Sequence, residues 1–306
     1  MSQPLVRWLS LRGYGLVTSA LFRATTPPEI MRRRFERWGA TSRATMRRRH
    51  PSLVFGDHSV GPLAIESVCA VERPTCAVLY LHGGAFVMGS PSCYRSRTAR
   101  LSHRCDAEVF VPDYRLAPEH PFPAALDDAL AAWQFLESHR PETALFVAGD
   151  SAGGGLALSL SIWLRDLGRP LPAGAVLMSP WTDLSRAPNG APRRDLWLSR
   201  QHLERWARYY VGGADATAPL VSPALADLSR LPPLLVLAGE DELLADGAAR
   251  LVERAREAGT EATLLLGEGM QHDWLLTLPW LDESRRAWTV VADFVERKRK
   301  SSRPRD

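Results

Sequence analysis

A serine flanked by glycines is the first sign of chemistry in this sequence. Gly149, Ser151 and Gly153 lie in the string FVAGDSAGGG, with the spacing Gly-x-Ser-x-Gly. An apolar run precedes the serine and a helix-length segment follows it, which is the context in which such a serine stands on a sharp strand-to-helix turn with its hydroxyl exposed. The positive end of the helix dipole would point at the same place. The pattern predicts that Ser151 is a nucleophile.

A serine hydroxyl needs a base to remove its proton and an acid to orient that base. In a fold with this turn the chain order is serine, acid, histidine, and only His202 and His272 follow Ser151. His202 lies in a helix-like segment, where a surface position explains it. His272 stands in GMQHDW, in the loop after the last apolar run. We therefore expect His272 to be the base.

The loop after LLVLAG offers several carboxylates for the acid, namely Glu240, Asp241, Glu242 and Asp246. Asp241 comes just after the strand end, whereas Asp246 has the position of a helix N-cap. We expect Asp241 to be the acid that orients His272. Asp150 and Asp273 adjoin the predicted nucleophile and base, and since neighbouring side chains point apart, we expect structural hydrogen bonds from both.

A glycine pair in YLHGGAF, residues 80–86, follows another apolar run. Glycine is favoured where the main chain needs unusual dihedrals or close approach, so a tight turn is one explanation. The other is an oxyanion hole, in which backbone N–H groups stabilise the negative oxygen formed when the serine attacks. We expect Gly84 and Ala85 to supply such donors together with Ala152, and His82 to brace the loop.

Short apolar runs alternate with helix-length segments from about residue 60 onward. This alternation predicts an α/β fold with a mainly parallel, doubly wound sheet, in which chemistry gathers at the carboxyl ends of the strands. The runs expected to be strands are PLAIESV, AVLYLHG, AEVFVPDY, ALFVAGD, GAVLMSP, LLVLAGE and ATLLLGE.

Two helical segments stand outside this alternation, at residues 1–50 and at about 185–218. We expect them to form a helical cap over the strand ends, with 51–306 as the catalytic domain and 185–218 as a second cap insertion. Trp181, Trp197 and Trp206 would then line a pocket, although plain core packing is the alternative for each tryptophan.

The composition, with 45% apolar and 24% charged residues, is that of an ordinary globular enzyme. The stretch at 5–22 is interrupted by Arg7 and Arg12 and is interpreted as a helix, neither a signal peptide nor a membrane span. Residues 1–50 hold eleven arginines against two glutamates, and 297–306 is also basic. These segments could contact anionic lipid or nucleic acid, but solvated helix faces explain them, and aromatic-basic interleaving is absent.

Four cysteines lack the spacing of a metal site, and metal-ligand histidine pairs are also absent. Reduced thiols in the cytoplasm are the default without an export signal. Cys69 and Cys76 could face each other on adjacent strands, but burial as small apolar side chains is the favoured interpretation.

Taken together, these stretches resemble the bacterial hormone-sensitive-lipase family of α/β-hydrolase carboxylesterases. The matching strings lie between residues 78 and 274: YLHGGAF, PDYRLAPEHPFPAALDD, GDSAGGGLA, SPWTDLS, AGEDELLAD and GMQHDW. The family's nucleophile, acid and base fall on Ser151, Asp241 and His272. The family often has proline where Glu242 stands and a third glycine where Ala85 stands. Arg115, Pro118 and Glu119 are expected to fix the neighbouring loop.

The resemblance implies a cofactor-free serine esterase that acts on small, short-acyl esters through an acyl-enzyme, with Phe86 and the cap aromatics shaping the pocket. It implies a small-molecule partner, no nucleic acid and no integral membrane segment, and the sequence allows a homodimer. An amidase, thioesterase or lactonase with the same triad remains an alternative, as does a non-catalytic receptor on the same fold. Halide and epoxide hydrolases of this fold use a carboxylate nucleophile, so Ser151 argues against them.

Overall fold

The computed structural model describes residues 9–13, 26–187 and 195–301. Residues 9–13 are helical, and the rest of the helix predicted at 5–22 lies outside the described residues. So do residues 188–194 of the second cap segment and the last five residues of the basic tail. None of the described helices combines the length and apolarity that crossing a bilayer requires.

An eight-stranded sheet forms the centre of the fold, in the order β1-β2-β4-β3-β5-β6-β7-β8. The first two neighbouring pairs, β1 with β2 and β2 with β4, are antiparallel, and all later pairs are parallel. The predicted α/β-hydrolase architecture, with a mainly parallel sheet, is confirmed. The strands are β1 Val54–Val60, β2 Leu63–Cys69, β3 Cys76–Leu81, β4 Ala107–Pro112, β5 Ala144–Asp150, β6 Ala175–Met178, β7 Leu234–Gly239 and β8 Ala262–Gly267.

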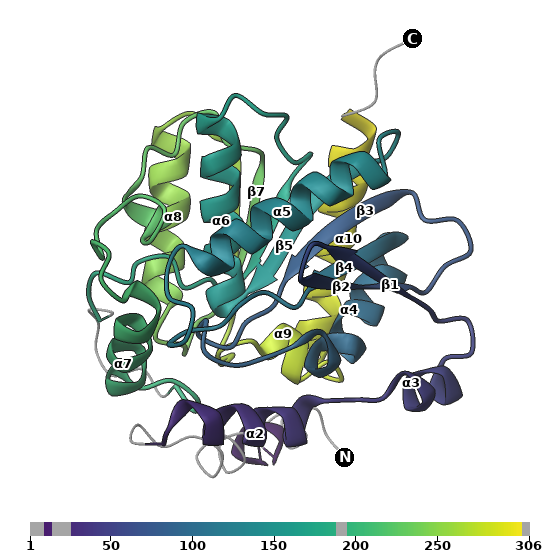
Figure 1. Cartoon of the computed structure of the whole chain (residues 1–306), viewed down its shortest axis with the longest axis horizontal. Coiled ribbons are helices and arrows are strands. Elements are labelled where there is room, and N and C mark those ends of the chain that lie inside the picture. The colour runs from purple at the N-terminus through teal and green to yellow at the C-terminus, as the bar shows by residue number, and fades with distance from the viewer. Residues whose placement is uncertain (1–8, 14–25, 188–194, 302–306) are drawn as a thin grey trace.

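Helices cover both faces of the sheet, so its central strands are buried on both sides. Every residue of β3, β4, β6 and β7 is buried, which explains why these strands are continuously apolar in the sequence. Helices α5, α6 and α8 lie in front of the sheet in Figure 1, and α4 and α10 lie behind it. Their bounds are α4 Pro91–Cys105, α5 Ala124–His139, α6 Ser151–Asp166, α8 Ala245–Glu257 and α10 Asp282–Ser301.

The remaining helices gather at the carboxyl ends of the strands or beside them. Helices α2 and α7 lie along the lower side of the molecule in Figure 1, with α3 at the lower right. They come from the two segments that the sequence places outside the strand-helix alternation. The bounds are α2 Pro28–Gly39, α3 Arg43–Arg49, α7 Arg200–Val211 and α9 Trp274–Thr277, with a 3-10 turn, η1, at Pro223–Leu225.

Two local predictions were wrong. Helix α8 begins at Ala245, so Asp246 lies inside its first turn and is not the N-cap. His202 is buried, because its ring stacks on Trp206 with centroids 5.0 Å apart. The alternative in which Cys69 and Cys76 face each other is excluded, because β4 lies between β2 and β3. The favoured burial is confirmed for Cys76, Cys69 is only partly buried, and all four cysteines are free.

Candidate active site

The nucleophile turn forms where β5 ends at Asp150 and α6 begins at Ser151. Ser151 has φ 50°, a left-handed conformation that L-residues adopt only where surrounding structure enforces it. A Cβ atom on Gly153 would lie 2.0 Å from the carbonyl oxygen of Leu81, at the end of β3. Glycine is therefore required at this position, because the turn packs directly against the backbone of the neighbouring strand.

Ser151 and His272, separated by 121 residues in the chain, meet above the sheet. Nε2 of His272 lies 3.0 Å from Oγ of Ser151, within hydrogen-bonding distance. The imidazole is 2% exposed, and the edge of the Trp197 ring packs against it with centroids 6.3 Å apart. This is the arrangement in which an imidazole can accept a hydroxyl proton.

The carboxylate beside the far side of the imidazole belongs to Glu242. Its Oε2 lies 3.7 Å from Nδ1 of His272, and the Glu242 side chain is fully buried. The predicted acid, Asp241, is only partly buried, and its amide donates to the carbonyl of Met270. The turn after β7 thus directs Glu242 toward His272. The prediction that Asp241 is the acid was wrong, and Glu242, one residue later, has this position.

Glu242 is held by groups that the sequence did not single out. Its Oε2 accepts hydrogen bonds from the Ser179 hydroxyl at 2.7 Å and from the amide of Gly239 at 3.1 Å. The same hydroxyl oxygen of Ser179 accepts from the amide of Asp273 at 3.1 Å. Ser179 therefore ties the glutamate to the residue that follows His272.

Two further carboxyl groups act on the imidazole. Asp273 Oδ2 lies 3.4 Å from Nε2 of His272, and burial raises the pKa of Asp273 well above its usual range. Asp195 is partly buried, and burial raises its pKa as well. Burial by itself lowers the pKa of His272, but Asp273, Glu242 and Asp195 outweigh it and raise this pKa to about 10. Three nearby carboxyl groups therefore favour the imidazolium.

Asp195 also connects the cap to the loop that carries Glu242. Its carboxylate accepts amide hydrogen bonds from Trp197 and Leu198 at 2.8 and 2.7 Å on the cap side. The other carboxylate oxygen accepts the amide of Leu243 at 2.9 Å. Nothing in the residue type or spacing of Asp195 marked it in the sequence, because this role depends on long-range contacts.

The glycine pair of YLHGGAF forms a loop directly beside Ser151. Gly84 and Ala85 line the same cavity as Ser151 and have φ 116° and 57°. Among the described residues, the amides of these two residues find no backbone acceptor. Ala152 is in the first turn of α6, where N–H groups have no acceptor within the helix. The structure thus brings the three predicted donors to one end of the sheet.

The loop is braced from below by Asp150. This buried carboxylate accepts hydrogen bonds from the Gly83 amide at 2.9 Å, the Tyr80 hydroxyl at 2.7 Å and the Tyr94 hydroxyl at 3.1 Å. The predicted structural role of Asp150 is confirmed. Because Asp150 immediately precedes Ser151, it also fixes the loop relative to the nucleophile.

His82 and its neighbours hold the start of the loop. Nδ1 of His82 donates to the carbonyl of Gly83 at 2.8 Å, and the ring stacks on Tyr114 with centroids 4.2 Å apart. Burial lowers the pKa of His82, so the ring is neutral. Tyr114 donates to the His82 carbonyl at 2.6 Å. The predicted bracing role of His82 is confirmed.

Helix α2 is attached to the far end of the loop through Arg32. The guanidinium donates to the carbonyls of Val87 and Ala117 at 2.6 and 2.7 Å, and it forms an ion pair with Glu119 at 2.5 Å. Arg115 pairs with Asp128 on α5 at 2.8 Å. The ion pairs expected of Arg115 and Glu119 are thus present.

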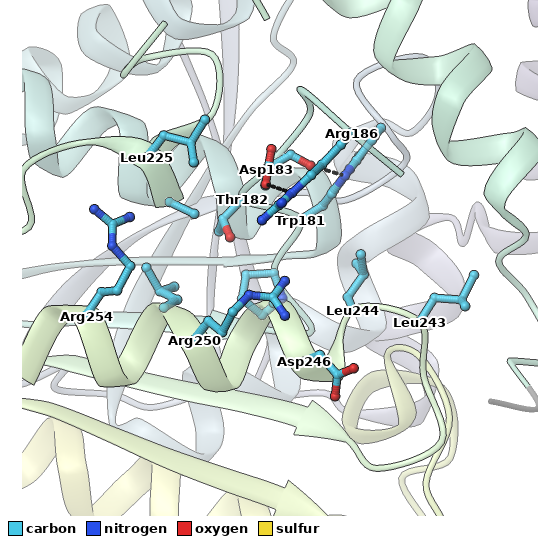
Figure 2. Close-up of a pocket in the computed structure, with 14 residues that line it drawn as sticks. Trp181, Thr182, Asp183, Arg186, Leu225, Leu243, Leu244, Asp246, Arg250 and Arg254 are labelled. Carbon is cyan, nitrogen blue, oxygen red and sulfur yellow. Dashed lines mark hydrogen bonds and ion pairs between the residues drawn. The ribbon is translucent and has the colours of Figure 1, made fainter. Parts of the chain in front are cut away.

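The cavity beside Ser151 has a volume of about 20 Å³. Trp197 and Trp206 line it, as predicted. Phe86 does not, because its left-handed φ of 62° turns the ring away to stack on Tyr210 at 3.7 Å. Trp181 lines a different cavity, together with Asp183, Arg186 and residues of α8 (Figure 2). The pocket predictions for Phe86 and Trp181 were therefore wrong.

Other lining residues were missed in the sequence. Phe35 reaches the cavity from α2, and Tyr94 and Arg97 reach it from α4. The three-residue spacing of Tyr94 and Arg97 would have placed them on one helix face, but nothing in the sequence showed that this face meets Ser151. Within the described part of the chain, no group of three or more His, Cys, Asp or Glu residues could hold a metal ion.

The fold, the nucleophile turn and the Ser151–His272 contact define an α/β hydrolase. A model of a family described by the α/β hydrolase fold matches residues 78–276. An acetyl-hydrolase of Streptomyces hygroscopicus is 42% identical over 243 residues, which cover 78% of this chain and 81% of the relative.

Two solved structures are similar over nearly the whole chain. A crystal structure of an esterase from the bacterial hormone-sensitive-lipase family is 33% identical with a TM-score of 0.83, covering 94% of this chain and 97% of the other. A crystal structure of EstE5 soaked with p-nitrophenyl butyrate is 34% identical with a TM-score of 0.83, covering 95% and 98%. The chain belongs to the bacterial hormone-sensitive-lipase family of α/β-hydrolase carboxylesterases, and it is an ester hydrolase.

The contact between Gly153 and Leu81 predicts a strong effect of one added methyl group. We expect Gly153→Ala to lower kcat/KM at least about 100-fold, because separating the two turns moves Ser151 from the Gly84 loop by a fraction of an ångström or more. Gly247→Ala on α8 is the matched control, since a Cβ atom there meets nothing within 4 Å. Steady-state hydrolysis of p-nitrophenyl acetate measures both, and equal activity of the two variants would contradict the packing argument.

The adjacent acids Asp241 and Glu242 allow a direct comparison. We expect Glu242→Gln to lower kcat by about 10⁴-fold, since an amide cannot stabilise the imidazolium and favours the wrong tautomer. Asp241→Asn should change kcat less than about threefold. The same assay measures both variants, with circular dichroism to confirm folding. A larger loss in the Asp241 variant would restore the acid expected from the sequence.

Asp273 should shift the pH profile. A negative carboxylate favours the imidazolium, whereas attack requires the neutral imidazole, so activity should rise with pH as His272 loses its proton. Asp273→Asn removes this contribution and lowers the pKa of His272, which moves the rising limb of kcat/KM to lower pH. Profiles of wild type and variant measure the shift, and a shift to higher pH would refute it.

Proposed function

We propose that the protein hydrolyses short-acyl carboxylic esters through an acyl-enzyme on Ser151. The observation that carries this proposal is the 3.0 Å contact between the Ser151 hydroxyl and His272, formed beside a cavity of only about 20 Å³. A cavity must have roughly 10–15 Å³ of volume accessible to water in order to hold one water molecule. The cavity therefore suits an acyl group with one or two heavy atoms beyond the carbonyl carbon.

In the proposed mechanism His272 removes the proton of Ser151 as the hydroxyl oxygen attacks the ester carbonyl. Nε2 then holds the proton beside the departing alcohol oxygen and protonates it. Glu242, in place of the acid expected from the sequence, keeps Nδ1 protonated and stabilises the imidazolium. A water molecule, deprotonated by the same Nε2, attacks the carbonyl carbon of the acyl-enzyme. As the bond between that carbon and the Ser151 oxygen breaks, Nε2 returns the proton to this oxygen, which releases the carboxylic acid and restores the Ser151 hydroxyl.

The negative oxygen of the tetrahedral intermediate would be held by the amides of Gly84, Ala85 and Ala152. Fixed N–H donors stabilise this charge more than they stabilise the substrate carbonyl, and removing one such donor costs about 3 kcal/mol of the barrier. The support for this role is that Gly84 and Ala85 line the Ser151 cavity and that Ala152 lies in the first turn of α6. Cap helices α2 and α7 contribute Phe35 and Trp206 to the walls of that cavity.

Cavity size also supports acetyl and propionyl esters as the substrate class. Trp197 and Trp206 are large, and the burial of Trp206 leaves that ring little freedom to make room for a longer chain. The similar acetyl-hydrolase of Streptomyces hygroscopicus bears a name consistent with such a group.

A cytoplasmic location and a homodimer both stay predictions. The four free cysteines support the cytoplasmic location.

A series of p-nitrophenyl esters from acetate to palmitate tests the substrate class. We expect kcat/KM to be highest for acetate and propionate and to fall steeply beyond, because longer chains exceed the cavity. A maximum at long chains would overturn the short-acyl proposal. Ser151→Ala is the control and should lose about 10⁶-fold in kcat.

A fluorophosphonate probe should label wild-type Ser151, and absence of labelling would favour a non-catalytic receptor.

A further inference from the structure

Another cavity lies between α3 and α4 and is called the second cavity below. It is separate from the ester site and from the cavity that Trp181 lines. Its volume is about 420 Å³, which is in the range of small-molecule pockets. Neither Ser151 nor His272 lines it. The two cavities are formed by different residues of α4, with Tyr94 and Arg97 lining the ester site and Arg100 and Arg104 lining the second cavity.

Three arginines surround this second cavity. Arg100 and Arg104 are four residues apart and so lie on one face of α4, and Arg49 comes from the last turn of α3. His50 and His103 stand beside them. Within the described ranges, the lining includes no aspartate or glutamate. The like charges of Arg100 and Arg104 repel one another at this spacing, and a bound anion would offset that repulsion.

Other arginines on the same two helices show how such charges are normally compensated. Arg43 on α3 and Arg95 on α4 both form ion pairs with the buried Glu66 at 2.7 Å. In contrast, Arg49, Arg100 and Arg104 form no ion pair or hydrogen bond with another described residue through their side chains.

Burial makes the missing partner costly at Arg100. Its pKa is lowered, first by burial and then by the charges of Arg104 and Arg97. An arginine is almost always charged, so Arg100 is a cation that lacks a counter-charge among the described residues. A bound anion would remove the repulsion and supply hydrogen-bond acceptors at once.

The rest of the lining limits the chemistry of that anion. Ser52 and Ser96 add hydroxyl donors, whereas Met46, Leu53 and Ala99 provide an apolar wall. Guanidinium groups approaching from two helices can bind several oxygens of one tetrahedral group, a geometry that suits phosphate. The volume leaves room for an organic part against the apolar wall.

We propose that the cavity between α3 and α4 binds a phosphoryl group carried by a small organic molecule. The group could belong to a free phosphate ester or to the headgroup of an anionic phospholipid, since both present the same oxygens. Such a site would recruit the esterase to a phosphorylated ligand without using the residues that perform hydrolysis.

Binding of defined probes tests this site. Sodium pyrophosphate and glycerol 3-phosphate are titrated into the full chain by calorimetry, and phosphatidylcholine vesicles with and without phosphatidylglycerol are used in co-sedimentation. The double variant Arg49→Gln, Arg104→Gln should weaken binding about tenfold or more, because each lost charged hydrogen bond contributes substantially. The control Arg33→Gln, Arg48→Gln makes the same change in net charge at exposed arginines outside the cavity and should stay within about twofold of wild type.

Saturable binding of a free probe that is lost in the cavity variant supports a free phosphate ester as the ligand. Binding confined to phosphatidylglycerol vesicles, lost in the same variant, supports the phospholipid headgroup. The proposal is overturned if wild type binds in neither assay or if both variants lose binding equally. Both variants should hydrolyse p-nitrophenyl acetate at the wild-type rate, which confirms their folding and keeps this result independent of the esterase mechanism.

Discussion

The site depends on a contact in which two stretches of main chain touch with no side chain between them. Gly153, at the start of α6, lies so close to the carbonyl of Leu81 that a methyl group cannot fit. Leu81 leads directly into the loop of Gly84 and Ala85, so the contact fixes the nucleophile and the amide donors relative to each other. Asp150 strengthens this link by accepting the Gly83 amide from the other side. The precision of the site therefore comes from rigid backbone and does not require mobile side chains to find their places.

Electrostatics near His272 are the second constraint. Three carboxyl groups act on one imidazole. Glu242 accepts from Ser179 and the Gly239 amide, and Asp195 accepts from backbone amides, whereas Oδ1 of Asp273 has no hydrogen-bond partner among the described residues. A buried carboxylate that lacked such donors would be costly and would be protonated instead. The donors come from the residue after β6, from β7 and the loop after it, and from residues 197–198, so the charge state of the base depends on all these parts being in place.

The sequence was sufficient for the nucleophile and the base because both follow from backbone rules at strand ends, where the chain order and turn are fixed. It was insufficient for the acid, since several consecutive acidic residues follow β7 and only the turn geometry directs Glu242 inward. Strand β1 was missed because Gly56, Asp57, His58 and Ser59 give no apolar run, and the strand pairs only with β2 at the sheet edge. The direction of Phe86 depends on a left-handed dihedral that residue type does not reveal.

Two residues of helix α2, Arg32 and Phe35, have different roles. One turn of the helix is bonded to the carbonyls of Val87 and Ala117 and cannot slide without breaking the loop beside the nucleophile. Phe35, three residues later, forms part of the wall of the ester cavity, where its ring packs against Tyr94 and Trp38. Substitutions at Phe35 can therefore reshape the space available to an acyl group while the register of the helix is preserved. New substrate ranges could arise in this lineage by exchanging one side chain on an anchored helix, with the chemical machinery left untouched.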